Sequence, residues 1–151
     1  MIPSARTSLL AAFVLLLPAT AIAQGARGHG SQGWGAGGAY ARLYDPAKVE
    51  KVTGRVVDVL KVTPMHGMSS GVEIVVKTAS DKVTVHLGPT WFLDNQDVRV
   101  LKGDDVVVEG SWIMLDGKPV VLAASVRKGD EILTLRDASG VPSWAGWRRT
   151  R

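Results

Sequence analysis

Apolar and polar residues alternate with a period of two through the centre of the chain, which is the pattern of half-buried β-strands. A valine-rich run at 52–61 is followed by a turn-rich segment at 63–71. Runs at 72–78 and 83–87 then alternate in the same way, and the second of them turns His86 away from the core. Three strands connected as a meander are therefore predicted.

A short helix is predicted where this alternation stops. Gly88 and Pro89 end the third strand, and the segment 90–96 begins with Thr90, a candidate N-cap, followed by three apolar residues. A helix of this length is stable only when it packs on the sheet.

Two further strands, at 105–115 and 120–127, are separated by a turn-forming segment at 116–119, and residues 132–136 form a strand-like addition. This order predicts an all-β fold, a small five- to six-stranded OB-type barrel with a short helix between strands 3 and 4. The number and pattern of the strands also fit other small barrels. Along 105–115, the period of two places these residues on one face: Val106, Val108, Gly110, Trp112 and Met114.

The first 23 residues have the pattern of a secretory signal peptide. Arg6 precedes a nine-residue apolar run and a small-residue cleavage motif that ends at Ala23. The apolar run is too short for a transmembrane helix, which needs roughly 20 residues. We therefore expect a periplasmic or secreted product with no transmembrane segment after cleavage.

The remaining chain divides into three parts by composition. Residues 24–47 are rich in glycine and predict a flexible tether, since seven of the fifteen residues at 25–39 are glycine. The OB-like barrel domain is assigned to 48–137, and a tail rich in tryptophan and arginine is assigned to 138–151.

Cysteine is absent, which excludes disulfides, cysteine-ligated metals and thiol catalysis. The formal net charge is +4, but between residues 48 and 137 there are 12 Lys and Arg against 13 Asp and Glu. The barrel therefore lacks the basic stripe typical of nucleic-acid binding, and nucleic acid is not favoured as a partner. Oligonucleotide binding stays as a further alternative, because OB faces can combine basic grooves with stacking aromatics.

The turn-rich segment carries the sharpest candidate for metal chemistry. Met65, His66 and Met68 place two thioethers and an imidazole within four residues, and this soft ligand set suits copper, especially Cu(I). His86 on the third strand would have to supply a further ligand. The alternative is that both methionines cover the end of the barrel while His66 faces water. Apart from copper in this hypothesis, no cofactor is predicted.

Four segments carry a resemblance to a known family: GRVVDV from Gly54, HLGPTWFL from His86, KGDDVVVEGSW from Lys102 and TLRDASGVPSWAGWRR from Thr134. Together they resemble the exported bacterial OB-like domain of the magnetosome MamS and MamX proteins, over roughly residues 48–149. This resemblance implies a secreted accessory domain, found alone or attached to redox modules, with no established catalysis. MamX-type chains also carry c-haem motifs, which this cysteine-free chain lacks.

These features favour an exported, non-enzymatic binding or accessory module of a cell-envelope assembly, and they leave open a link to metal or redox handling. Catalysis has little support, because no serine lies in a nucleophile elbow and only three histidines are present. The alternative function is periplasmic copper binding through the Met-His-x-Met loop.

An envelope protein is the expected partner, although its identity is open. The tail combines aromatic anchors with cations, a composition suited to an interface or to an anionic membrane surface. Alternatively, its first tryptophan packs over the barrel while the arginines keep the end soluble. The candidate partner contacts are Trp144, Trp147, Arg148 and Arg149.

Overall fold

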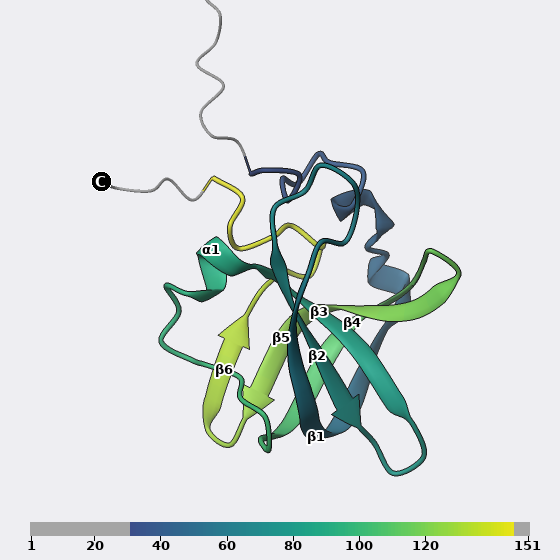
Figure 1. The fold of residues 1–151 in the computed structure, drawn as a ribbon, viewed down its shortest axis with the longest axis vertical. Helices are drawn as coiled ribbons and strands as arrows, with labels where there is room; N and C mark the ends of the chain where they lie inside the picture. The colour runs from purple at the N-terminus through teal and green to yellow at the C-terminus, as the bar shows by residue number, and fades with distance from the viewer. Residues whose placement is uncertain (1–30, 147–151) are drawn as a thin grey trace, which may run out of the picture.

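The computed structural model of this protein describes residues 31–146 (Figure 1). The signal peptide predicted at 1–23 lies outside this range. Within it, no helix is long and apolar enough to cross a membrane. In chain order the elements are η1 (Ala41–Leu43), η2 (Pro46–Lys48), β1 (Val49–Val62), β2 (Gly71–Lys77), β3 (Lys82–Pro89), α1 (Thr90–Leu93), β4 (Asp105–Leu115), β5 (Lys118–Lys128) and β6 (Glu131–Thr134).

The strands form a closed barrel. They make one sheet in the order β3-β2-β1-β4-β5-β6, in which neighbouring strands pair antiparallel. A further parallel pairing of β3 with β5, through Val85–Val121 and His86–Leu122, closes the ring and leaves β6 beside β5. The predicted all-β, OB-type barrel with a short helix between β3 and β4 is thereby confirmed.

Aliphatic side chains from alternate strand positions fill the interior, and Val56, Ile74 and Val85 are fully buried. Helix α1 closes against this core through Phe92, whose ring lies 5.3 Å from that of Trp144. This packing stabilises a helix that is too short to persist alone. The residue before the helix, Pro89, is its N-cap, rather than the predicted Thr90.

The predicted face of β4 holds as far as Trp112, which lies opposite Val121 and packs against the core, whereas Met114 near the end of the strand is 63% exposed. A β-bulge between Glu109 and Gly110 shifts the register of β4 against β5. The extra residue is Ala124 on β5, because Glu109 pairs with Ser125 and Gly110 pairs with Ala123. It reverses which side chains of β5 face the core, so that Val121 lies opposite the core residue Val85 and Leu122 faces outward. Glycine is required at the bulge, since a Cβ at Gly110 would lie 2.5 Å from the carbonyl oxygen of Leu122.

Residues 31–48, which we name the strap, pack against the outside of the barrel. From residue 31 onward this differs from the flexible tether predicted over 24–47. The strap buries three aromatic side chains, and Trp34, Tyr40 and Tyr44 are no more than 9% exposed. The apolar area of these rings offsets the backbone entropy that a glycine-rich segment loses on ordering.

Residues 135–146, which we name the clasp, lie beside the strap and join it through two tryptophans. Trp144 Nε1 donates a hydrogen bond to the Trp34 carbonyl oxygen at 2.7 Å, and the two rings meet edge to face at 6.1 Å. Glycines on β2 and β3 leave room for these rings to pack against the strands. A Cβ at Gly71 would lie 2.4 Å from the Trp34 ring, and one at Gly88 would lie 2.7 Å from the Trp144 ring.

Candidate functional site

Four residues from β2, β3, β5 and β4 lie side by side beneath the strap. Glu73 is opposite His86, His86 is opposite Leu122, and Leu122 is opposite Ser111. Directly opposed residues share one face of a sheet, so we name these four residues the covered row. Leu122 and Ser111 are fully buried and His86 is 2% exposed. His86 thus points away from the barrel core, as predicted, but into a second buried layer.

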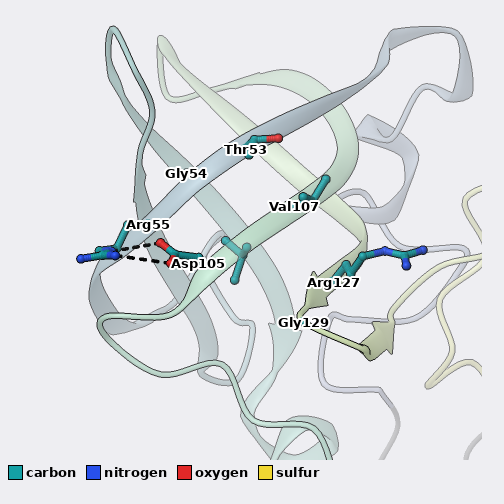
Figure 2. Close-up of a pocket in the computed structure, with 8 residues that line it drawn as sticks. Thr53, Gly54, Arg55, Asp105, Val107, Arg127 and Gly129 are labelled. Carbon is teal, nitrogen blue, oxygen red and sulfur yellow. Dashed lines mark hydrogen bonds and ion pairs between the residues drawn. The ribbon is translucent and has the colours of Figure 1, made fainter.

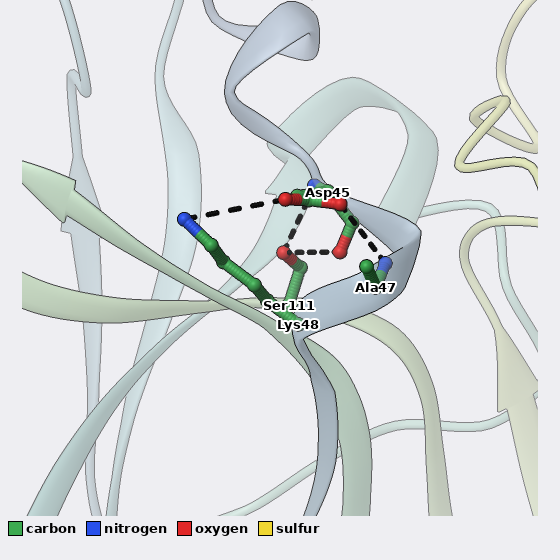
Figure 3. A network of polar contacts seen from close by, with 4 residues as sticks. All are labelled: Asp45, Ala47, Lys48 and Ser111. Atoms are coloured by element: carbon green, nitrogen blue, oxygen red, sulfur yellow. Dashed lines mark hydrogen bonds and ion pairs between the residues drawn. The ribbon is translucent and has the colours of Figure 1, made fainter.

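The strap is fastened to this row at two points. Tyr40 Oη lies 2.9 Å from His86 Nδ1, and the two rings stack. Further along, the Asp45 backbone N–H donates to Ser111 Oγ at 3.0 Å, and the Ser111 hydroxyl donates to the Asp45 carbonyl oxygen at 2.9 Å (Figure 3). The Asp45 carboxylate also accepts from the Ala47 N–H at 2.9 Å, which caps η2. The strap therefore provides hydrogen-bond partners for the buried side chains of His86 and Ser111.

The hydrogen-bond partners of His86 define its tautomer. His86 Nε2 lies 3.2 Å from Glu73 Oε2, and a carboxylate can only accept. Nε2 therefore carries the hydrogen, and Nδ1 accepts from the Tyr40 hydroxyl. A neutral imidazole in this form connects the strap to β2 with both ring nitrogens engaged.

Burial lowers the pKa of the His86 imidazole, and it outweighs the nearby Glu73 carboxylate, which raises that pKa. The positive charge of Arg136 acts in the same direction as burial. Burial also raises the pKa of the Tyr40 hydroxyl above its usual range, against the charge of Arg136. Both rings are consequently held in their neutral forms near pH 7.

Arg136 of the clasp completes this polar cluster and is 4% exposed. Its guanidinium donates to the Ala123 carbonyl oxygen of β5. Its Cζ lies 5.6 Å from the centre of the Tyr44 ring and 5.1 Å from that of Trp144. Burial lowers the pKa of this guanidinium. The cation holds strap, clasp and β5 together through aromatic faces and a carbonyl group.

The four predicted metal ligands have different surroundings. Met65, His66 and Met68 share the loop between β1 and β2, where His66 is exposed. Met68 packs on the strap, since a Cβ at Gly33 would lie 2.5 Å from Met68 Cγ. His86 is not free to bind a metal, because both of its nitrogens are engaged. Across residues 31–146, no group of three or more His, Cys, Asp or Glu side chains could hold a metal ion. The copper hypothesis therefore depends on the loop alone.

The predicted partner contacts of the tail are described only in part. Trp144 is 2% exposed and packs over the barrel, which matches the alternative interpretation of this residue. Trp147, Arg148 and Arg149 lie outside the described residues. Trp144 is therefore buried within the protein and is not available to a partner.

A second cross-strand row lies on an uncovered part of the barrel. Thr53, Val107, Arg127 and Ile132 are opposed in turn across β1, β4, β5 and β6, and we name them the open row. Arg127 is exposed, and Ile132 is 47% exposed. Two shallow depressions, of about 390 and 500 Å³, meet at Val107 and Arg127. Figure 2 shows the first depression, with the Arg127 side chain at its margin.

The charges around the open row are unevenly paired. Arg55 donates to Asp105 at 3.0 Å on one side, as Figure 2 shows, and Lys51 lies 3.4 Å from Glu109 on the other. Among the residues that the structure describes, Arg127 forms no ion pair. The row therefore presents one unpaired cation between two neutralised pairs.

The fold and the two rows define a small OB-type barrel that seals one outer surface with its own strap and leaves another open. The chain belongs to the MamS/MamX magnetosome protein family, whose family model matches residues 48–133. This confirms the resemblance seen in the sequence motifs. No curated protein sequence matches the chain. Both rows lie inside the matched region, whereas the fastening residues Tyr40 and Arg136 lie outside it.

The sequence analysis missed the cluster around His86. Glu73 and His86 both occupy outward positions of predicted strands, which was a signal that they could meet. Tyr40 lies among glycines and Arg136 follows an apolar strand, so neither has a local pattern that indicates burial. Their pairing becomes visible only when strap and clasp are placed on the barrel.

Proposed function

We propose that this protein is an exported, non-enzymatic accessory module that binds a partner protein in a cell-envelope assembly. The chain belongs to a family described as magnetosome proteins, which supports a role in magnetosome assembly in cells that form magnetosomes. The observation that carries the proposal is the open row, where an exposed isoleucine and an unpaired arginine lie beside two depressions. Exposed apolar groups beside an arginine are typical of protein interfaces.

The surroundings of the two histidines that the structure describes support a role without catalysis. A general base must lie within hydrogen-bond reach of a substrate proton. His86 is 2% exposed, and both of its nitrogens are engaged by Tyr40 and Glu73. His66 lies exposed on the loop between β1 and β2. Neither histidine has the arrangement of an activated catalytic base.

Export is supported by the pattern of the first 23 residues and is tested by cell fractionation. The full chain is expressed in its source cells, and the mass of the product is measured in each fraction. We expect a periplasmic or secreted product that begins after Ala23. A cytoplasmic product that retains its first residues would contradict export.

Partner binding is tested by the size of the assembly that contains the chain. Tagged full-length protein is extracted gently from the cell envelope at its native level, cross-linked, and sized by native electrophoresis. We expect a discrete complex larger than the monomer, and mass spectrometry of that band identifies the partner. Recovery of the monomer alone in every fraction would overturn the proposal.

A further inference from the structure

We propose that the open row binds an extended segment of the partner protein in which an acidic residue has apolar residues two positions to either side. This inference rests on the proposed function and adds the chemistry of the segment that is recognised. The residues that carry it are Val107, Arg127 and Ile132, with Thr53 at the end of the row on β1.

The acidic residue is inferred from the charge at the centre of the row. Arg127 is exposed and unpaired within the described residues, whereas Arg55 and Lys51 are each neutralised by a carboxylate. An incoming carboxylate therefore finds one free guanidinium, which can bind it through two parallel hydrogen bonds. The carboxylates of Asp105 and Glu109 on either side disfavour an acidic residue at the neighbouring positions.

The apolar residues are inferred from the two depressions. Both have Val107 and Arg127 in their walls. On β4 the first also reaches Asp105 and the second reaches Glu109, so they lie on the two sides of this pair. Gly54 and Gly129 contribute no side chain to the first depression, and Ile132 contributes its aliphatic side chain to the second. Each depression can bury one apolar side chain of a partner, with a gain of roughly 25 cal/mol for each Å² removed from water.

The extended conformation is inferred from the order of these features along β5, where the first depression continues past Arg127 to Gly129 and the second continues to Ser125. In an extended chain, side chains at positions i−2, i and i+2 lie on the same side and repeat at roughly 6.6 Å. An acidic residue at i then reaches Arg127 while its neighbours at i−2 and i+2 enter the depressions. The intervening residues face water.

A nucleic acid or an anionic lipid surface fits this row less well. A phosphate backbone requires several unpaired cations in sequence. The open row offers only Arg127, since the neighbouring Lys51 and Arg55 are already paired. A polypeptide that carries one carboxylate between apolar side chains matches both the charge and the shape of the row.

The test uses the full mature chain, labelled with ¹⁵N, and the synthetic peptide acetyl-Thr-Val-Thr-Asp-Thr-Val-Thr-amide, followed by NMR. We expect amide shift changes centred on the open row. Arg127→Glu weakens this binding by on the order of tenfold, the size of a lost charge-assisted hydrogen bond. Lys118→Glu is the matched control, because it makes the same change at an exposed lysine of β5 outside both depressions.

Reversal of both charges provides the decisive comparison. A second peptide with lysine in place of the aspartate should bind Arg127→Glu better than the original protein. Equal binding of both peptides to both proteins, or shift changes away from the open row, would overturn the inference. Arg127 is exposed, so its substitution should leave the fold intact. Retained dispersion of the NMR spectrum of Arg127→Glu checks this.

The same variants separate this inference from the proposed function. If the envelope complex forms and Arg127→Glu disrupts it while Lys118→Glu does not, both are supported. If the complex persists in Arg127→Glu and the peptide does not bind, the inference fails and the proposed function stands. If no complex forms with the original chain, the proposed function fails, irrespective of peptide binding.

Discussion

The covered row and the open row lie on the same barrel and share strands β4 and β5, yet the first is buried under the strap and the second is exposed to solvent. In the covered row, His86 and Ser111 find all their partners within the chain, because Tyr40 and Asp45 of the strap reach them. In the open row, Arg127 is left to the solvent. Identical sheet geometry therefore yields an interior or a surface according to what the chain lays over it.

The difference shows what each kind of polar residue requires. A buried polar group without a hydrogen bond costs free energy, whereas an exposed one is satisfied by water. Substitutions in the covered row should therefore lower stability, and substitutions in the open row should lower binding while stability stays constant. The following experiments test this division.

The largest effect on stability is expected from Trp34→Ala. This substitution removes a ring that packs on Gly71, Tyr40 and Trp144, and we expect the free energy of unfolding to fall by about 3–5 kcal/mol. Urea denaturation measures the change. Met114→Ala, at a residue that is 63% exposed, is the control and should change stability by less than about 0.5 kcal/mol. If Trp34→Ala lowered the free energy of unfolding as little as this control, the strap would not be part of the folded core.

A smaller loss is expected from Tyr40→Phe, which deletes one hydroxyl and leaves His86 Nδ1 without its donor. The expected cost is about 1–3 kcal/mol in the free energy of unfolding. Tyr44→Phe is a matched control, because the Tyr44 hydroxyl has no hydrogen-bond partner among residues 31–146. Equal effects of the two substitutions would show that the hydrogen bond to His86 contributes nothing.

Lowering the pH should gradually lower the free energy of unfolding, because His86 lies in the covered row. Because burial lowers the pKa of His86 in the folded state, the unfolded chain takes up a proton first as the pH falls through about 6.5. The free energy of unfolding therefore decreases as the pH falls below that value, and this contribution is complete above it. Denaturation curves between pH 5 and 8 measure the slope. His86→Gln, which does not titrate, should flatten the slope, and an unchanged slope would show that another group is responsible.

The smallest effect on stability is expected from Arg127→Ala in the open row. Because this side chain is exposed and unpaired in the described structure, the free energy of unfolding should change by less than about 0.5 kcal/mol. Partner binding should fall nonetheless, which native electrophoresis of the envelope complex detects. A loss of stability comparable to that of Tyr40→Phe would remove the distinction between the two rows.

Much of the barrel could be predicted from the sequence, because a period of two directly reports which side chains face the core. This rule reached its limit on β5. The bulge at Ala124 shifts the phase of that strand, so that Val121 faces the core and Leu122 faces the strap. Opposite the bulge, a Cβ at Gly110 of β4 would lie 2.5 Å from the carbonyl oxygen of Leu122. No local pattern in β5 could reveal this neighbour on another strand.

The strap and the polar cluster were less predictable for a different reason. Glycine content indicates how much entropy a segment loses on ordering, but it does not report how much apolar area a few aromatic residues can bury. Trp34 and Tyr40 supply that area. Gly71 of β2 makes room for the Trp34 ring, and Gly88 of β3 makes room for the Trp144 ring. The order of the strap therefore depends on complementary shapes that meet only in the folded chain.

The hydrogen bond between Trp144 and Trp34 joins positions 110 residues apart and places the two ends of the described chain at the same end of the barrel (Figure 1). A pulling force applied at residues 31 and 146 would act first on this tryptophan pair. Strap and clasp would then peel off one contact at a time, before the strand ladders bear the load. The barrel itself would be mechanically shielded by its own ends.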